Sequence, residues 1–182
     1  MRIGVSGPGG VGKTTLCYYL SHCLQITHIR EGVRSWLTQK SYYSPWLLSQ
    51  KEQINLQYWF LGYKIRLETY NDFFVSDRTT LDAVVLSRLR SVSEEMKRSV
   101  TLLEYIATNH AKNAYDLILV LTANRVRLQP DGCRIQDKNL CIAEEEMIIE
   151  LLKKLDVPFY VIQEPDNETI LKLVLDHYKN TL

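Results

Sequence analysis

The amino-acid sequence predicts an α/β protein in which helices cover both faces of a parallel sheet of five strands. Short apolar or β-rich segments alternate along the chain with longer segments in which apolar residues recur at helical spacing. One short segment, residues 116–122, is continuously apolar from Leu117 to Leu121, as a strand buried on both faces must be. A glycine-rich segment follows the first predicted strand and precedes the first predicted helix. Together these observations favour a three-layer sandwich.

The strands are expected where apolar or β-branched residues gather over a few positions. The first strand leads directly into the glycine-rich segment, the third ends in a carboxylate at Asp77, and the fourth is the continuous apolar run. The predicted strands are residues 3–5, 26–30, 72–77, 116–122 and 158–163.

The helices are expected where apolar residues recur every three or four positions. Leu16, Leu20 and Leu24 form one such stripe, and Pro45 suits the first turn of a long helix that contains no proline. Residues 124–139 are polar and contain Pro130-Asp131-Gly132, which predicts a loop with a turn. The predicted helices are residues 14–24, a turn at 33–39, then 46–70, 80–90, 93–112, 140–155 and 168–179.

The glycine-rich segment is a full match to the phosphate-binding loop G-x-x-x-x-G-K-[ST], known as the P-loop. Glycines let successive N–H groups point into one concavity, and the N-terminus of the following helix favours an anion. We expect Lys13 to reach the β- and γ-phosphates of ATP and the Thr14 hydroxyl to ligate Mg²⁺. The alternative is a glycine-rich turn that precedes a helix by chance. The expected ATP-binding residues are Gly7, Gly9, Gly10, Val11, Gly12, Lys13, Thr14, Thr15 and, beyond the fourth strand, Arg125.

Polar residues suited to phosphoryl transfer follow four of the five predicted strands. The second strand ends at Arg30-Glu31, the third at Asp77-Arg78, and the fourth opens into a segment with Arg125. In open α/β sheets, ligands bind beyond the carboxyl ends of the strands, so we expect these side chains to converge. A carboxylate there can hold Mg²⁺ or accept a proton, and an arginine can stabilise a transferring phosphoryl group.

Each of these candidates also has an ordinary structural interpretation. Glu31 can be a solvated turn residue, and Asp77 can cap the helix that follows it. Arg134, which follows a turn in the 124–139 loop, is the preferred catalytic arginine of that loop. An aromatic group at helical spacing can stack on an acceptor ring or can pack in the core; its members are Trp46, Tyr58, Trp59, Phe60 and Tyr63.

Taken together, these motifs resemble the small-molecule branch of the P-loop kinases. They are most similar to the AAA-like domain family that includes the kinase domain of ribosylnicotinamide kinases, and more distantly to thymidylate and deoxynucleoside kinases. In thymidylate kinases a proline follows Arg-Glu, whereas Gly32 follows here. The residues that carry the resemblance are Gly7 to Thr14, Arg30-Glu31 with Arg34, Asp77-Arg78-Thr79 with Asp82, and Asp131-Gly132-Cys133-Arg134.

The resemblance implies a P-loop NTPase sandwich with strand order 2-3-1-4-5. It implies that Glu31 or Asp77 is the catalytic or metal-linked carboxylate, that Asp77 and Thr14 hold the metal, and that Arg78 lies on the acceptor side. It also implies a mobile lid over residues 124–139 that carries Arg134. Lys13, Glu31, Asp77, Arg78 and Arg134 are therefore the expected catalytic residues.

The leading functional prediction is an ATP- and Mg²⁺-dependent kinase that phosphorylates a nucleoside, a nucleotide or a related small acceptor. One alternative is a nucleotide-binding switch or lipid-binding module without efficient transfer, although no Asn-Lys-x-Asp guanine signature is present. Another is a kinase that acts on a modified base in DNA. The formal net charge of +1 disfavours DNA, because contacts with phosphates dominate the affinity for DNA.

Composition supports an ordinary globular chain. With 182 residues, 46% hydrophobic and 24% charged, we expect a single domain over residues 1–182. The longest apolar run, residues 115–123, is too short to cross a bilayer and no signal peptide is visible, so we expect a cytoplasmic location without membrane contact. The four cysteines lack metal-ligand spacing and are expected to be reduced, with Cys17 and Cys23 packed on the first helix. A homodimer is compatible with this composition.

Overall fold

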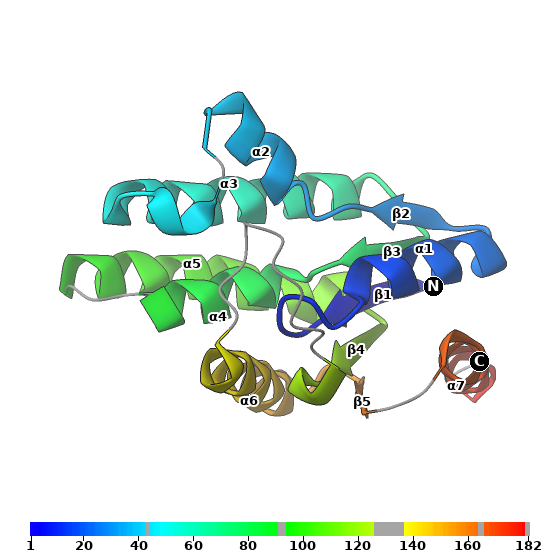
Figure 1. Cartoon of the computed structure of the whole chain (residues 1–182). Coiled ribbons are helices and arrows are strands. Elements are labelled where there is room, and N and C mark those ends of the chain that lie inside the picture. The colour runs from blue at the N-terminus through cyan, green and yellow to red at the C-terminus, as the bar shows by residue number, and fades with distance from the viewer. Residues whose placement is uncertain (43, 91–93, 126–136, 164–165, 181–182) are drawn as a thin grey trace.

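A computed structural model describes residues 1–42, 44–90, 94–125, 137–163 and 166–180 (Figure 1). Its centre is a parallel five-stranded sheet with the order β2-β3-β1-β4-β5, so the predicted fold class and strand order are confirmed. The strands are β1 Arg2–Ser6, β2 Thr27–Ile29, β3 Phe74–Asp77, β4 Leu117–Leu121 and β5 Phe159–Ile162.

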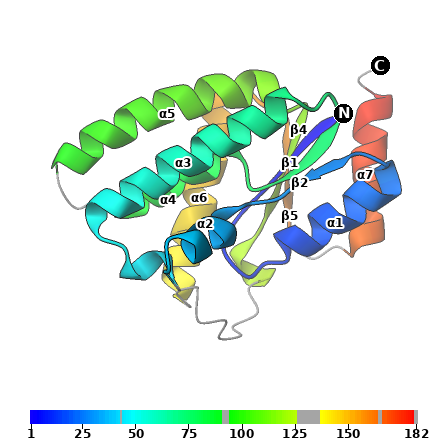
Figure 2. The same cartoon turned by 90° about the horizontal axis from the view of Figure 1, so that it is seen from above.

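Helices cover both faces of the sheet. Helices α1 and α7 lie on one face, and α3, α4, α5 and α6 lie on the other (Figures 1 and 2). The helices are α1 Lys13–Leu24, α2 Val33–Gln39, α3 Gln50–Thr69, α4 Thr80–Arg90, α5 Glu94–Ala114, α6 Lys138–Leu155 and α7 Asn167–Lys179, with short 3₁₀ turns at Pro45–Leu47 and Ala123–Arg125.

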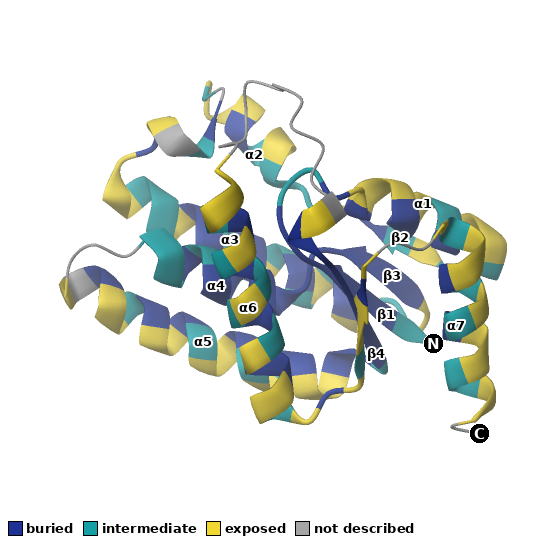
Figure 3. Ribbon diagram, turned by 60° about the horizontal axis from the view of Figure 1, so that its bottom comes forward, coloured by how far each residue is buried: buried dark blue, intermediate teal, exposed yellow. Residues whose placement is uncertain are grey.

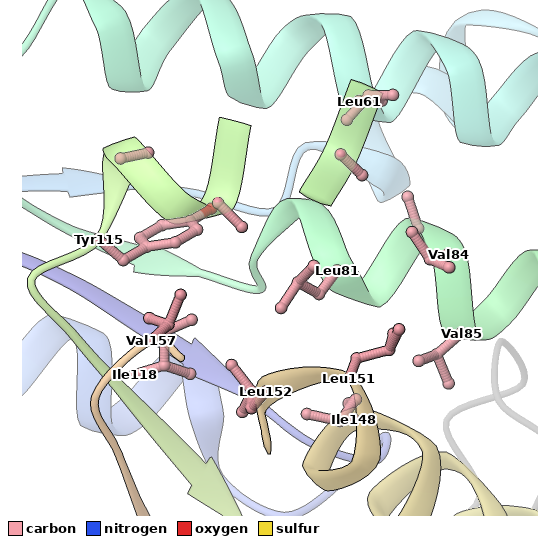
Figure 4. Packing of buried hydrophobic residues seen from close by; sticks show 14 of the residues in the cluster. Leu61, Leu81, Val84, Val85, Tyr115, Ile118, Ile148, Leu151, Leu152 and Val157 are labelled. Atoms are coloured by element: carbon pink, nitrogen blue, oxygen red, sulfur yellow. The ribbon is translucent and has the colours of Figure 1, made fainter. Parts of the chain in front are cut away.

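The core follows the alternation of side chains along the strands. In β4, Leu117, Leu119 and Leu121 pack toward α1 and α7, whereas Ile118 and Val120 pack with the helices of the other face. The strands β1, β3 and β4 are buried on both faces (Figure 3). The packing between the sheet, α4 and α6 on the second face is shown in Figure 4.

Some predicted boundaries were wrong. The long helix does not begin at residue 46: α3 begins at Gln50, because Ser49 and Glu52 form a capping box in which each side chain accepts a hydrogen bond from the other's backbone N–H. Helix α6 begins at Lys138 because the Asp137 side chain accepts hydrogen bonds from the first-turn N–H groups. Strand β3 is shorter than predicted: it begins at Phe74, and Phe73 before it is exposed.

The structure also tests the expectations about membrane-spanning helices and about the cysteines. No helix within the described ranges is both long and apolar enough to cross a membrane. Cys17 is buried, as predicted, but Cys23 is exposed and does not pack in the core. Cys133 lies outside the residues that the structure describes.

Candidate functional site

The candidate site lies at the carboxyl edge of the sheet, where β1 and β3 end beside each other. Val5 of β1 is in register with Asp77 of β3, and the Arg78 N–H extends the pairing by donating to the Val5 carbonyl at 2.9 Å. Gly7 follows β1 with a φ of +126°, and a Cβ at this position would lie 2.3 Å from the Leu121 carbonyl oxygen. Only glycine lets the phosphate-binding loop leave the sheet so close to β4.

Lys13 is buried and spans the phosphate-binding loop. Its ammonium donates to the carbonyl oxygens of Gly7 at 2.7 Å and Pro8 at 2.5 Å. Lys13 is also the first residue of α1, whose N-cap is Gly12 with a φ of +96°. The ammonium therefore lies inside the loop, next to the N-terminus of a helix, and both features favour a bound anion.

The surroundings of Lys13 favour its neutral form and lower its pKa. The pKa of Lys13 is lowered from 10.5 to about 8, first by burial and then by the positive charge of Arg78. The carboxylates of Glu144, Asp82 and Glu31 partly oppose this shift. A bound phosphate would add negative charge beside the ammonium and stabilise its protonated form.

Asp77 faces the helix that follows the phosphate-binding loop. Its Oδ2 accepts a hydrogen bond from the Thr14 hydroxyl at 2.6 Å, while its Oδ1 is buried without a hydrogen-bond partner among the described residues. A buried, unpartnered carboxylate oxygen beside a hydroxyl suits Mg²⁺, which prefers oxygen ligands and retains bound water. Thr14 and Asp77 therefore fit the metal expected here.

Asp77 does not cap helix α4, so the capping interpretation of this residue was wrong. The carboxylate that caps the helix belongs to Asp82, whose Oδ2 accepts from the Thr79 N–H at 2.8 Å and from the Thr79 hydroxyl at 3.0 Å. The same oxygen accepts from Ser6 Oγ at 2.6 Å. Asp82 thus ties the start of α4 to the end of β1 and leaves Asp77 facing Thr14.

The Arg78 side chain contacts α6, whereas the Asp77 side chain contacts α1 on the other face of the sheet. Its Nε donates to Glu31 Oε1 at 2.9 Å, and its Nη1 donates to Asp82 Oδ1 at 2.7 Å and Glu144 Oε1 at 2.9 Å. Burial alone would lower the pKa of Arg78, but the carboxylates, led by that of Glu144, raise the pKa well above its usual value. The φ of Arg78 is +66°, a conformation that costs a non-glycine residue about 1–3 kcal/mol.

Glu31 follows β2 and is more exposed than the other carboxylates around Arg78. Its side chain retains 29% of its accessible surface, against 7% for Glu144. Gly32 comes next with a φ of +78°, and a Cβ there would lie 2.8 Å from the Tyr63 ring. Proline cannot adopt a positive φ, so the turn seen here excludes proline at position 32.

The aromatic group, for which stacking on an acceptor and packing in the core were both considered, divides in two. Trp59 and Tyr63 stack with ring centroids 5.1 Å apart, and both rings lie against Gly32. Phe60 is buried in the core, and the Tyr58 hydroxyl donates to the Ser99 carbonyl. Of this group, the two stacked rings lie beside the turn that carries Glu31.

Glu144 is a site residue that the sequence analysis missed, and Asp82 was noted without a role. A detectable signal was present, because the buried positions of α6 form one stripe in which Glu144 is the only carboxylate; they are Cys141, Glu144, Ile148, Leu151 and Leu152. A charge within an apolar helical stripe needs a buried partner.

The predicted arginines lie in different places. Arg30 is exposed, and Arg125 lies in the 3₁₀ turn after β4. Arg134 and most of the predicted lid lie outside the described residues.

Solved structures with this fold include several kinases. The chain is similar to a deoxyadenosine kinase from M. mycoides with bound dCTP, with a TM-score of 0.72 and 19% identity over 100% of both chains. It is similar to a thymidylate kinase from Candida albicans, with a TM-score of 0.65 and 15% identity over 98% of this chain and 91% of that one. It also matches NadR protein in complex with NR, with a TM-score of 0.66 and 16% identity over 96% of this chain and 50% of that one.

Sequence comparisons identify the family. None of the curated proteins compared with this chain matches it. The sequence model of the AAA domain family matches residues 2–169, which carry the phosphate-binding loop and every described residue of the candidate site. The resemblance predicted from the sequence motifs is thereby confirmed, and the chain belongs to this AAA domain family of P-loop proteins.

Proposed function

We propose that the protein is a kinase that transfers the γ-phosphoryl group of ATP to a hydroxyl group of a small acceptor. The supporting observation is the shared position of two sets of side chains at one edge of the sheet. Lys13 and the Thr14–Asp77 pair lie on the loop side, and the Glu31–Arg78 pair lies on the side of β2 and α6. The kinases that share this fold support the same class of reaction.

On the donor side, the phosphate-binding loop would hold the phosphates of ATP. Lys13 would exchange its two carbonyl partners for phosphate oxygens, because hydrogen bonds to charged acceptors are stronger. Mg²⁺ would be held by the Thr14 hydroxyl and the Asp77 carboxylate and would neutralise charge on the phosphates. Asp77 is therefore assigned to the metal.

On the acceptor side, Glu31 is the better candidate for the group that accepts the hydroxyl proton. Its carboxylate is partly exposed, whereas the Asp77 carboxylate is buried and already bound to Thr14. Arg78 orients Glu31 by donating a hydrogen bond from its Nε to Glu31 Oε1.

The acceptor class follows from the groups around Arg78. Its Nε and Nη1 already donate to three carboxylates, which compensate its positive charge. A phosphate on the acceptor would therefore gain little attraction from Arg78. An uncharged hydroxyl can donate to Glu31, which a phosphate dianion cannot do. The stacked Trp59 and Tyr63 beside Gly32 favour an acceptor with a ring, so a nucleoside fits better than a nucleotide.

The test is ADP formation from ATP and Mg²⁺ with a panel of acceptors. The panel contains deoxynucleosides, ribonucleosides, nicotinamide riboside, nucleoside monophosphates and DNA with hydroxymethylated bases. We expect turnover with at least one nucleoside. Turnover with monophosphates alone would overturn the acceptor class, and turnover with DNA alone would favour the DNA kinase. Tight ATP binding with no turnover would favour a nucleotide-binding module.

A further inference from the structure

A buried polar network lies beneath the candidate site, on the side of helix α3. Lys64 and Glu68, one helical turn apart on α3, have fully buried side chains. The Lys64 ammonium donates to the Asp77 carbonyl at 3.0 Å and reaches the Ile29 carbonyl at 3.5 Å. These carbonyls belong to the last residues of β3 and β2. Lys64 therefore joins the carboxyl ends of two neighbouring strands.

Glu68 connects Lys64 to the chain segment around the site. Its Oε1 lies 3.8 Å from the Lys64 ammonium and accepts from Ser76 Oγ at 2.5 Å. The Tyr115 hydroxyl donates to Glu68 at 2.9 Å and accepts from the Thr80 N–H at 3.1 Å. The network thus holds the segment from Ser76 to Thr80, which contains Asp77 and Arg78, at both of its ends.

Stability alone gives a poor reason for this arrangement. The free energy that two charges lose when they are removed from water is seldom fully compensated by their attraction to each other. Apolar side chains of similar size therefore often stabilise a core equally well. The segment it holds contains Arg78 in a left-handed conformation, which persists only where the surroundings enforce it. Full burial also keeps Lys64 away from any substrate.

We propose that Lys64 is a positioning residue that sets the distance between Glu31 and the Asp77–Arg78 turn. Glu31 follows β2 by two positions and Arg78 follows β3 directly, so the Glu31–Arg78 ion pair and the Lys64 contacts join the same two strand ends. Without Lys64, β2 and β3 lose one of these two links, and Glu31 shifts relative to Arg78. This role rests on the phosphotransfer proposed for the site.

The experiment compares Lys64→Met with the double variant Lys64→Met/Glu68→Gln. The single variant removes one of the two basic side chains beside the buried Glu68 carboxylate, the other being His110 at 2.8 Å, and can fail to fold. The double variant removes the charges of both Lys64 and Glu68 and keeps the side-chain volumes. Lys51→Met is the matched control, because it makes the same change at an exposed position of α3. Folding of each variant is verified by circular dichroism and thermal melting.

The first readout is the ¹H–¹⁵N signal of Arg78 Nε, which requires no catalysis. We expect a resolved signal in the wild type and in Lys51→Met, and a shifted or broadened signal in the double variant. The second readout is kinetic: kcat of the double variant falls by about 10²-fold, as for a misplaced catalytic group, while KM for ATP changes little.

Wild-type kcat or an unchanged Arg78 Nε signal in the folded double variant would overturn the positioning role. A wild-type protein without turnover would overturn the proposed function, and the Arg78 signal would then decide the positioning role alone.

Discussion

Asp77 and Arg78 are neighbours in the chain, but their side chains belong to two different regions of the site. Asp77 contacts Thr14 at the start of α1, so the loop region is made from one short stretch of chain and a single carboxylate. Arg78 contacts Glu31 and Glu144, which lie 47 and 66 positions away in the sequence. The proposed acceptor region is therefore assembled from the ends of β2 and β3 and from α6.

The two regions also differ in how their charges are arranged. Among the described residues of the loop region, Lys13 donates only to carbonyl oxygens and Asp77 keeps one oxygen without a partner, so both groups have capacity for a ligand. In the acceptor region, Arg78 is surrounded by carboxylates. This contrast underlies our proposal that the loop region binds a highly charged ligand together with a cation, whereas the acceptor region binds an uncharged one.

The largest expected effect comes from the loop region. Lys13→Met should lower kcat by about 10³-fold or more, because it removes a positive charge from the phosphate-binding loop. The fold should persist, since the change deletes a buried charge that makes no ion pair in the described structure. Turnover is measured together with the melting temperature. Wild-type kcat in a folded variant would exclude the phosphate-binding loop from the mechanism.

The next effect tests the acceptor region. Glu31→Gln should lower kcat by about 10²-fold, because the amide cannot accept the hydroxyl proton, while KM for ATP stays nearly constant. Steady-state rates at saturating ATP and varied acceptor provide the measurement. An equal loss in Asp77→Asn alone, with Glu31→Gln fully active, would move the proton acceptor to Asp77.

A smaller effect distinguishes the residue that holds the metal from the residue that accepts the proton. Asp77→Asn should raise the Mg²⁺ concentration required for half-maximal rate by about 10- to 100-fold, because the metal loses a negatively charged partner. Titration of Mg²⁺ at constant ATP measures the change, and Glu31→Gln serves as the control with an unshifted midpoint. If both variants keep the wild-type midpoint, Asp77 does not hold the metal.

The smallest effect is the pH dependence of nucleotide binding. Lys13 has a pKa of about 8 in the free protein, so the affinity for ATP should fall about tenfold between pH 7 and pH 9, as the ammonium loses its proton. Calorimetry measures this change, and Lys13→Arg should show none, because arginine stays protonated.

The same pKa predicts the sign of a stability change. Lys13 binds fewer protons in the folded state than its ordinary pKa of 10.5 implies for the unfolded chain. The stability of the wild type relative to Lys13→Met should therefore rise as the pH increases from about 8 to 10.5. A relative stability that falls over this range would show that the ammonium is not destabilised by burial.

Sequence patterns predicted most of the fold. The strands and helices were found because their apolar residues repeat with the period of each element, and errors arose where local hydrogen bonds set a boundary, as at Ser49 and Glu52 before α3. The roles of Glu144, Lys64 and Glu68 were missed, although each charge lies on the buried face of a helix. Such a charge indicates a buried partner but does not identify it.

The sequence by itself determined the parallel α/β architecture and the phosphate-binding loop. Both depend on short-range features, the periodicity of apolar residues and the backbone freedom of Gly7 and its neighbours, which consecutive residues express directly. Only the tertiary structure decided that Asp77 faces Thr14 and that Arg78 faces Glu31 and Glu144. The reason is that these pairings depend on how strands and helices distant in the chain pack together, and neither periodicity nor spacing specifies which side chains then meet.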